Sequence, residues 1–313
     1  MSAKRWVAAI LLSVSSATSF ALNAVINSFD LVDLIDANEV IVLDIREQAT
    51  EFKAGHIPGS RHLPYTAFRG PDHNPGQLLS LDVLSERLES IGLTPKDAIV
   101  IVHDGVTTSD FGAAARVYWT LKSVGFESLS ILNGGFRGYQ KDGFDLASGD
   151  HEITPTELAL RFNGQWYAGT RDVQDAVEGA EGLLVDARLA AFYEGTSWHA
   201  AAGRPGAIPG ANLIPFERFF DAGTPLLKDD GDVLAIVTDY NLQGPQVITY
   251  CNTGHWAATN WFVLSEVARI PNVKLYAESM VEWSNTGAPM VNVPSALQFA
   301  MLKTKGWLDR LVN

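Results

Sequence analysis

Cys251 is the only cysteine of the 313-residue chain, and its place in the sequence indicates chemistry. It follows a β-branched and aromatic run, residues 247–250, and precedes a short loop that contains Gly254. Residues 257–268 then have the apolar spacing of a helix. Backbone amides and a helix dipole at such a junction stabilise a thiolate, which is the nucleophilic form. We predict that Cys251 is a nucleophile; the alternative is a buried cysteine that packs as a small apolar residue.

The residues after the cysteine form the predicted active-site loop. They are Asn252, Thr253, Gly254, His255, Trp256 and Ala257. Gly254 permits the positive φ that lets the loop curl and turn its N–H groups toward the sulfur. We expect Thr253 to hydrogen-bond the sulfur or to be an ordinary loop hydroxyl. A protonated His255 would help to hold an anionic substrate, whereas a solvent-facing histidine would not. Trp256 is expected either to wall the pocket or to pack on the domain below.

Length and composition set the broad class. The chain is long enough for two domains, and its 47% hydrophobic residues suffice for sizeable cores. A formal net charge of −13 argues against nucleic acids and anionic membrane surfaces as partners. We expect neither a cofactor nor a metal ion.

The first residues have the pattern of a signal peptide. Lys4 and Arg5 precede an apolar run at residues 6–14, and small residues lead to a cleavage site after Ala21. We therefore predict a signal peptide at residues 1–21, export to the periplasm, and no membrane attachment after its removal. The alternative is an uncleaved anchor. A single cysteine cannot form an internal disulfide in that compartment, which favours a chemical role.

Strand and helix patterns alternate along the chain, which predicts an α/β fold with a mainly parallel sheet flanked by helices in each half. The predicted strands are 40–44, 98–104, 128–132, 183–188, 247–251 and 273–276, and the predicted helices are 28–38, 81–91, 111–124, 136–139 and 171–177. Ser28 is the predicted cap of the first helix. Because ligands of parallel sheets bind at the carboxyl ends of the strands, Cys251 is well placed for catalysis.

The second half of the chain repeats the first. Asp44-Ile45-Arg46 recurs as Asp186-Ala187-Arg188, and Gly-His-Ile-Pro-Gly-Ser at 55–60 recurs as Gly-Ala-Ile-Pro-Gly-Ala at 206–211. In this alignment Asp104 stands where the second half has Cys251. Repeats roughly 150 residues apart indicate duplicated domains.

These motifs resemble the two-domain rhodanese family of sulfurtransferases. The resemblance covers residues 28–290 and implies two tandem rhodanese-like domains that face each other across the active site. The predicted boundaries are a signal peptide at 1–21, an N-terminal domain without the cysteine at 28–146, a linker at 147–165, a catalytic domain at 166–296 and a tail at 297–313.

The resemblance implies that Cys251 cycles between thiolate and persulfide. A sulfane sulfur would pass from thiosulfate, or a related small anion, to a thiol or cyanide acceptor. Two alternatives stay open: a carrier that receives persulfide sulfur from a sulfur-relay protein, and a 3-mercaptopyruvate-type sulfurtransferase. A third alternative is that the chain is a structural interaction domain whose thiol is inert.

The chain departs from the family where the sulfur donor binds. Relatives that use thiosulfate have basic residues in the loop, and both groups have an arginine at the position that Phe192-Tyr193 occupies here. Arg188 and Arg204 are the candidate substitutes. The Asp-x-Arg residues are also expected to brace their own domains by internal salt bridges.

Two further possibilities concern the rest of the site. His103, Asp104 and Thr107 of the first repeat are candidates for the rim of the cleft; otherwise that repeat is a structural partner only. A related phosphatase loop needs an arginine six residues after the cysteine, and this chain has Ala257 there. We therefore exclude a phosphatase.

Overall fold

The computed structural model describes residues 22–150, 152–179, 182–242, 246–302 and 304. The predicted signal peptide at 1–21 and residues 303 and 305–313 of the predicted tail lie outside these residues. None of the helices in the described ranges is both long and apolar enough to cross a membrane.

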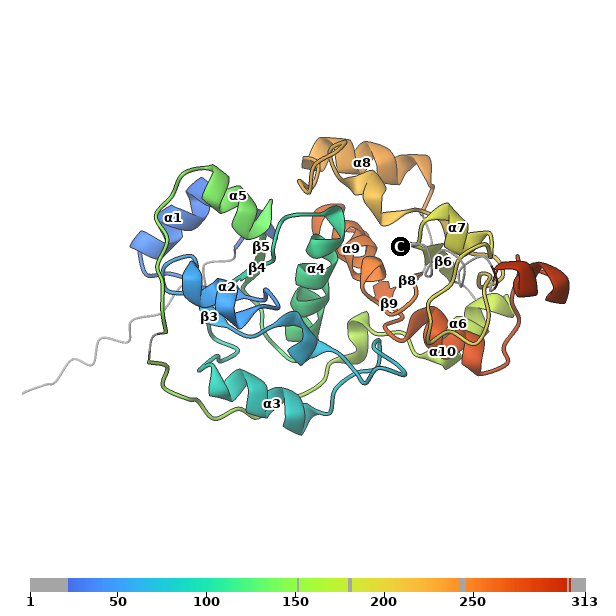
Figure 1. The fold of residues 1–313 in the computed structure, drawn as a ribbon, viewed down its shortest axis with the longest axis horizontal. Helices are drawn as coiled ribbons and strands as arrows, with labels where there is room; N and C mark the ends of the chain where they lie inside the picture. The colour runs from blue at the N-terminus through green and yellow to red at the C-terminus, as the bar shows by residue number, and fades with distance from the viewer. Residues whose placement is uncertain (1–21, 151, 180–181, 243–245, 303, 305–313) are drawn as a thin grey trace, which may run out of the picture.

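Two parallel sheets form the centre of the two halves (Figure 1). The first has the order β1 (Val25–Ile26), β5 (Leu129–Leu132), β4 (Ile99–Val102), β2 (Ile41–Asp44), β3 (Arg61–His62). The second has the order β7 (Asn212–Leu213), β6 (Leu183–Asp186), β8 (Val247–Tyr250), β9 (Val273–Leu275). The predicted strands are confirmed. The two-residue strands β1, β3 and β7 were not predicted because they are too short for a pattern.

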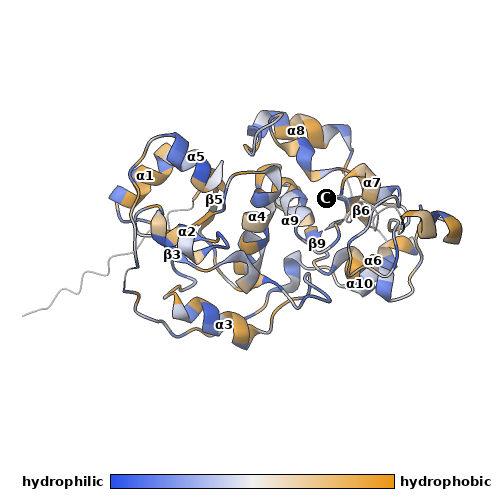
Figure 2. Ribbon diagram, viewed as in Figure 1, coloured by the Kyte–Doolittle hydropathy of each residue, from blue (hydrophilic) through white to orange (hydrophobic). Residues whose placement is uncertain are grey.

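Helices cover both sheets. They are α1 (Ser28–Asp36), α2 (Ala49–Ala54), α3 (Leu81–Ser90), α4 (Thr108–Ser123), α5 (Gly135–Lys141), α6 (Thr170–Val177), α7 (Ala190–Tyr193), α8 (Asp230–Asp239), α9 (Trp256–Phe262) and α10 (Ser279–Asn285). The outer helices α1, α3 and α8 each have hydrophobic and hydrophilic stretches, as amphipathic helices do (Figure 2). The short helices η1 (Tyr65–Phe68), η2 (Gly164–Trp166) and η3 (Phe216–Phe219) lie in the connections.

Two predicted helices need correction. The cap of α1 is Asn27, not Ser28: the Asn27 side chain accepts hydrogen bonds from the amides of Phe29 and Asp30. The helix predicted at 257–268 is not α-helical throughout, because α9 ends at Phe262 and a π-helical turn, Val263–Val267, continues it. A single π turn shifts the α-helical spacing by only about one residue, which the periodicity of a short apolar run does not resolve.

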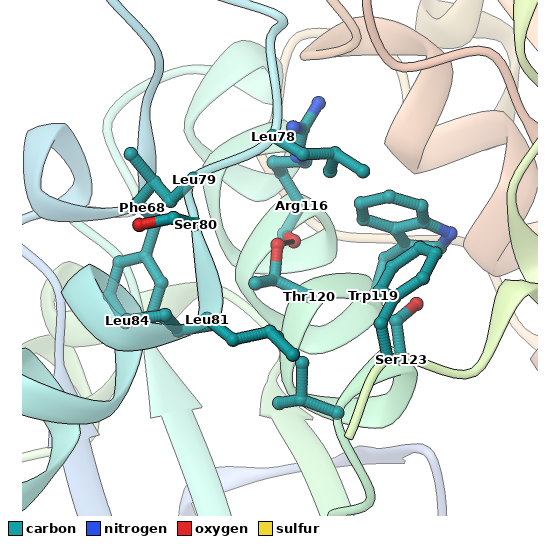
Figure 3. A pocket seen from close by; sticks show the side chains of 12 residues that line it. Phe68, Leu78, Leu79, Ser80, Leu81, Leu84, Arg116, Trp119, Thr120 and Ser123 are labelled. Atoms are coloured by element: carbon teal, nitrogen blue, oxygen red, sulfur yellow. Dashed lines mark hydrogen bonds between the residues drawn. The ribbon is translucent and has the colours of Figure 1, made fainter. Parts of the chain in front are cut away.

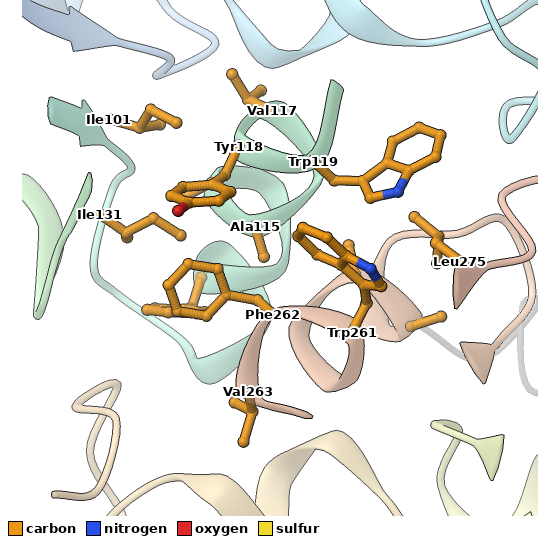
Figure 4. Close-up of a cluster of buried hydrophobic side chains, with 14 of the residues drawn as sticks. Ile101, Ala115, Val117, Tyr118, Trp119, Ile131, Trp261, Phe262, Val263 and Leu275 are labelled. Atoms are coloured by element: carbon orange, nitrogen blue, oxygen red, sulfur yellow. The ribbon is translucent and has the colours of Figure 1, made fainter. Parts of the chain in front are cut away.

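The two halves share a hydrophobic core where α4 of the first packs beside α9 of the second (Figure 4). The Tyr118 ring meets Phe262 edge to face, with centroids 5.0 Å apart. At the rim of this core, Lys122 forms a salt bridge of 2.7 Å with Glu266, which also accepts from the Tyr118 hydroxyl. Because this core is continuous, the first half holds the start of α9, and the loop before it, in a fixed position.

Candidate active site

Cys251 lies directly after β8, at the carboxyl edge of the second sheet, and its residue is 1% exposed. The loop that follows it leads into α9 at Trp256, so the predicted strand-cysteine-loop-helix order is present. The loop is packed against the first half of the chain. Cys251 is therefore at the interface between the two halves.

The strand register identifies the first-half residue that corresponds to Cys251. The equivalent strand pairs are Asp44 with Val102 in the first sheet and Asp186 with Tyr250 in the second. The next residues are His103 and Cys251, and their carbonyl oxygens each accept from the second residue of α5 and α10, respectively. The predicted alignment of Asp104 with Cys251 is therefore wrong by one residue: His103 has that place, and Asp104 corresponds to Asn252. The sequences of the two loops share too little to fix the register.

The carbonyl groups of the loop point to neighbours outside it. Cys251 and Asn252 accept from backbone amides of α10, and Thr253 accepts from Arg69 Nη2 at 2.8 Å. By contrast, within the described residues, no backbone carbonyl accepts from the amides of residues 252–255. Carbonyls that point outward leave the N–H groups on the inner side of the curve. This is the arrangement of a nest that binds an anion.

Gly254 makes the curve possible. Its φ is +68°, as predicted, which side chains other than glycine rarely adopt. A Cβ atom there would lie 2.3 Å from the carbonyl oxygen of Ala277 and 2.5 Å from Arg116 Nη1. Neighbours on two sides therefore also require a glycine.

Ser279, at the start of α10, fixes the backbone of the cysteine. Its Oγ accepts a hydrogen bond from the Cys251 amide at 3.0 Å and donates to the carbonyl of Tyr276 at 2.7 Å. Ser279 has a φ of 53°, and the equivalent Gly135 in the first half has 59°. Backbone strain of this kind is retained where a position is strongly constrained. The sequence gives no signal for this contact because Ser279 lies 28 residues from Cys251.

The first half covers the loop with side chains from two elements. Tyr65, in η1, has its hydroxyl 2.9 Å from His255 Nδ1, and Ser109, in α4, has its Oγ 3.0 Å from His255 Nε2. Arg69 and Arg116 reach the carbonyls of Thr253 and Gly254. None of these four residues was predicted. The only sequence signal is a charged residue, Arg116, within the mostly apolar stretch 111–121 of α4.

His255 and Trp256 are both used in contacts between the halves. Burial, together with the charge of Arg69, lowers the pKa of His255 to about 3, so its ring is neutral near pH 7. The predicted positive charge on His255 is therefore wrong. Trp256 stacks on Phe216 with centroids 4.9 Å apart and donates from Nε1 to Ser109 Oγ at 2.8 Å. Trp256 was predicted either to wall the pocket or to pack on the domain below, and the structure shows it packed.

The remaining loop residues are buried. Asn252 is 7% exposed, and among the described residues its Oδ1 accepts no hydrogen bond. Thr253 is 8% exposed and contacts Arg69 through its carbonyl. The carbonyl of Ala257 accepts from the Thr249 hydroxyl at 3.0 Å, which joins the start of α9 to β8.

Among the described residues, neither candidate arginine of the second half forms a hydrogen bond with the cysteine loop. Arg188 is 1% exposed; it binds both carboxylate oxygens of Asp186 and the carbonyl of Gly206, as Arg46 does with Asp44 and Gly55. The predicted bracing role is therefore the one observed. Arg204 donates to the carbonyl of Ala288, beyond α10, and no contact described for it reaches the loop.

Among the described residues, none of the three first-half residues predicted for the rim hydrogen-bonds the cysteine loop, although Thr107 lines a cavity together with Glu217 and Phe220 of the second half. Burial lowers the pKa of His103 to about 4, so this buried ring is neutral. Thr107 and Asp110 form the capping box of α4. Burial raises the pKa of Asp104, whose carbonyl accepts from the Arg137 amide. The contacts with the loop come instead from Ser109 and Arg116, further along α4.

A separate cavity of about 240 Å³ lies beside α4 in the first half (Figure 3). Its lining is mostly apolar, with Phe68, Leu84 and Trp119 among the side chains, and no residue of the cysteine loop lines it. Arg116 borders this cavity, but its guanidinium extends past the apolar side chains to the carbonyls of Gly76 and Gly254. The cavity is therefore distinct from the candidate active site.

Comparison with known proteins gives a consistent set of relatives. The family model of the rhodanese-like domain matches residues 30–142 and 170–286. A thiosulfate sulfurtransferase of Pseudomonas aeruginosa is 29% identical, over 84% of this chain and 95% of the relative. The sulfur carrier protein TtuD of Thermus thermophilus is 26% identical, over 82% of this chain and 91% of the relative.

A solved structure has the same fold. The crystal structure of SseA from Escherichia coli, described with the catalytic mechanism of 3-mercaptopyruvate sulfotransferases, superposes with a TM-score of 0.72 and 25% identity. The match covers 82% of this chain and 99% of SseA. Both sheets and the cysteine loop of this chain fall within the residues that the family model matches.

Proposed function

This chain belongs to the rhodanese-like domain family, and we propose that it is a sulfurtransferase that carries the transferred sulfur as a persulfide on Cys251. The donor is a small anion with a sulfane sulfur, thiosulfate or a related compound, and the acceptor is a thiol or cyanide. Both half-reactions are displacements at sulfur, so the enzyme follows ping-pong kinetics.

In the first half-reaction the Cys251 thiolate attacks the outer sulfur of thiosulfate. A new S–S bond forms, the S–S bond of thiosulfate breaks, and sulfite leaves with the electron pair. In the second, cyanide or a thiolate attacks the outer sulfur of the persulfide. Thiocyanate or a new persulfide leaves, and the Cys251 thiolate returns. No proton transfer is required in either displacement.

The observation that supports this proposal best is the orientation of the loop backbone. Its carbonyls bind α10 and the first half, whereas the amides of residues 252–255 donate to no described backbone carbonyl. Such amides stabilise an anionic sulfur in the thiolate, in the persulfide and in the transition states between them. A single preorganised donor of this kind contributes about 3 kcal/mol in comparable oxyanion sites.

The test is thiocyanate formation from thiosulfate and cyanide by the full chain and by Cys251→Ser. The proposal expects ping-pong kinetics for the full chain and no turnover for the variant. Full activity of Cys251→Ser across a panel of sulfane donors would contradict it. Including 3-mercaptopyruvate in the panel tests that donor class at the same time.

The aromatic Phe192 favours a second candidate, a persulfide carrier that is loaded by a partner protein. Phe192 stands at the position of the family's donor arginine and packs edge to face on Trp256, with centroids 5.7 Å apart. The relative TtuD is named a sulfur carrier. A carrier would load sulfur much faster from a protein persulfide than from thiosulfate, so the two loading rates separate the candidates.

Export to the periplasm is part of the proposal. It rests on Lys4, Arg5 and the apolar run at residues 6–14. Expression of the full chain followed by N-terminal sequencing of the periplasmic fraction tests it. A mature protein that begins at Leu22 would support export, and retention of the chain in the cytoplasm would contradict it.

A further inference from the structure

We propose that the cavity beside α4 is a binding site for a small, uncharged and largely apolar molecule that carries one hydrogen-bonding group. The volume of the cavity is about 240 Å³. An apolar cavity of about 150 Å³ is large enough to bind benzene, so this one has room for a substituted aromatic ring. Within the described part of the chain, no residue of the cysteine loop lines it. Its ligand is therefore not a substrate of Cys251, and the site is additional to sulfur transfer.

One wall of the cavity is a stripe of α4. The residues of this stripe have the helical spacing i, i+3, i+4 and i+7, and they are Arg116, Trp119, Thr120 and Ser123. A different stripe of the helix meets the second half of the chain, where Tyr118 packs edge to face on Phe262. Packing between the halves therefore covers one side of α4 and leaves the other side to line the cavity.

Trp119 gives this wall a fixed aromatic surface. The residue is fully buried, and its Nε1 donates to the carbonyl of Trp166 at 2.9 Å. Because the only polar atom of the ring already has a partner, Trp119 offers the cavity apolar surface alone. Phe68 and Leu84 add apolar side chains across the cavity from it (Figure 3). A lining of this kind selects a ligand that is mostly hydrocarbon.

Ser123 supplies a hydroxyl for the polar group of the ligand. The residue is 1% exposed, and its Oγ has no hydrogen-bond partner among the residues that the structure describes. The other two hydroxyls of the lining are in use: Thr120 donates to the carbonyl of Arg116 at 2.8 Å, and Ser80 accepts from the Val83 amide at 3.4 Å. A buried water molecule needs about two to four polar partners. A single unpaired hydroxyl in an apolar lining therefore suits a ligand with one polar group better than it suits water.

The charge of Arg116 is directed away from the cavity. Its Nη2 donates to the carbonyl of Gly76 at 3.0 Å, and Nη1 lies 3.5 Å from the carbonyl oxygen of Gly254, beyond the apolar side chains (Figure 3). Its Nε is buried and has no partner in the described ranges, so an anion drawn to Nε is the alternative that the experiment must exclude. An ion in this lining would lose its hydration and gain little in return. We therefore assign an uncharged ligand.

Phe162 provides the way in. It lines the cavity from the connection between the two halves, and its residue is 40% exposed. The next residue anchors this connection, because the Asn163 amide donates to the carbonyl of Ser123 at 2.7 Å. Rotation of the Phe162 side chain can thus admit a ligand while the backbone stays in place.

The test is isothermal titration calorimetry of the full chain with 2-phenylethanol, which joins a phenyl ring to one hydroxyl. Propylbenzene replaces that hydroxyl by a methyl group, and phenylacetate is the charged analogue. We expect saturable binding of 2-phenylethanol and an affinity for phenylacetate that is at least about tenfold weaker. No saturable binding of 2-phenylethanol would overturn the proposal, and so would tighter binding of phenylacetate.

Ser123→Ala locates the polar contact. It should weaken the binding of 2-phenylethanol about tenfold and leave the affinity for propylbenzene unchanged, because only the first ligand uses Oγ. Without ligand, this variant should unfold at the same or a higher temperature, since an unpaired buried hydroxyl is removed. Ser90→Ala, in α3 but outside the lining, is the matched control and should change neither affinity. Equal affinities of the parent and Ser123→Ala for 2-phenylethanol would contradict the assignment.

Leu84→Trp locates the apolar part of the site. The larger side chain fills the cavity and should abolish binding of 2-phenylethanol and propylbenzene alike. Undiminished binding by a folded Leu84→Trp chain would place the ligand elsewhere and overturn the proposal. If this buried variant does not fold, Ser123→Ala decides alone.

Discussion

Ser279 accepts a hydrogen bond from the backbone amide of Cys251 at 3.0 Å, from a position where the backbone has a φ of 53°. The first domain has Gly135 at the equivalent position, with nearly the same φ and no hydroxyl. The second domain thus has a side chain that fixes the nucleophile, although the conformation there favours glycine.

Replacing Ser279 by glycine or alanine tests this contact. Both variants leave the buried Cys251 amide without its partner, so each should lower the rate of persulfide formation and destabilise the fold by about 1–3 kcal/mol. Ser279→Gly should be the more stable of the two because it relieves the positive φ. Urea unfolding and donor kinetics measure these effects. Wild-type rates in both variants would show that the bond does not position Cys251.

Gly254→Ala should both destabilise the protein and abolish sulfur loading. Its Cβ atom would lie 2.3 Å from the Ala277 carbonyl oxygen, so the loop must move. Gly210→Ala is the matched control, because Gly210 has a φ of 76° and no atom within 4 Å of the added Cβ. We expect the control to cost about 1 kcal/mol with activity retained, and Gly254→Ala to cost more than about 3 kcal/mol. Equal losses of stability and activity in the two variants would contradict the claim that neighbouring atoms leave no space for a side chain at Gly254.

His255 should make the protein less stable at mildly acidic pH. Its pKa is about 3 in the folded protein, below the ordinary value of 6.5, so the unfolded chain binds the proton more tightly. The contribution of the neutral His255 ring to the free energy of unfolding is therefore complete above pH 6.5 and is lost as the pH falls toward 3. Between pH 7 and 5 the loss amounts to roughly 1–2 kcal/mol. His255→Asn should show a smaller loss than the parent in urea unfolding at the two pH values; equal losses would contradict a neutral His255.

Arg188→Gln distinguishes a bracing arginine from a donor-binding one. The substitution leaves Asp186 buried without its partner and should cost about 3–5 kcal/mol. Arg46→Gln, in the same arrangement with Asp44, should cost a similar amount. Thermal unfolding measures both. A raised KM for the donor with unchanged stability would instead support donor binding by Arg188.

The sequence predicted the features that depend on local patterns. Apolar runs located the longer strands, the repeated Asp-x-Arg and Ile-Pro-Gly motifs revealed the duplication, and Gly254 indicated a positive φ. The cap of α1, Asn27, was missed by one residue because Ser28 is also a good cap. Helix α8 was missed because Gly231 and three aspartates obscure its apolar spacing.

Features that depend on contacts between distant residues were not predicted. The alignment of Asp104 with Cys251 was wrong because only strand pairing shows that His103 is equivalent. The charge expected on His255 is absent because Tyr65 and Ser109 enclose the ring from the other domain. Arg69 lies 184 residues from Thr253, and no periodicity in the sequence connects them.

The central claim is that Cys251 carries the transferred sulfur, and the most direct measurement is the intact mass of the full chain after incubation with thiosulfate. We predict a gain of about 32 Da, one sulfur atom, that is lost on addition of cyanide and never forms in Cys251→Ser. An unchanged mass with every sulfane donor and with a protein persulfide, or the same gain in Cys251→Ser, would contradict the account.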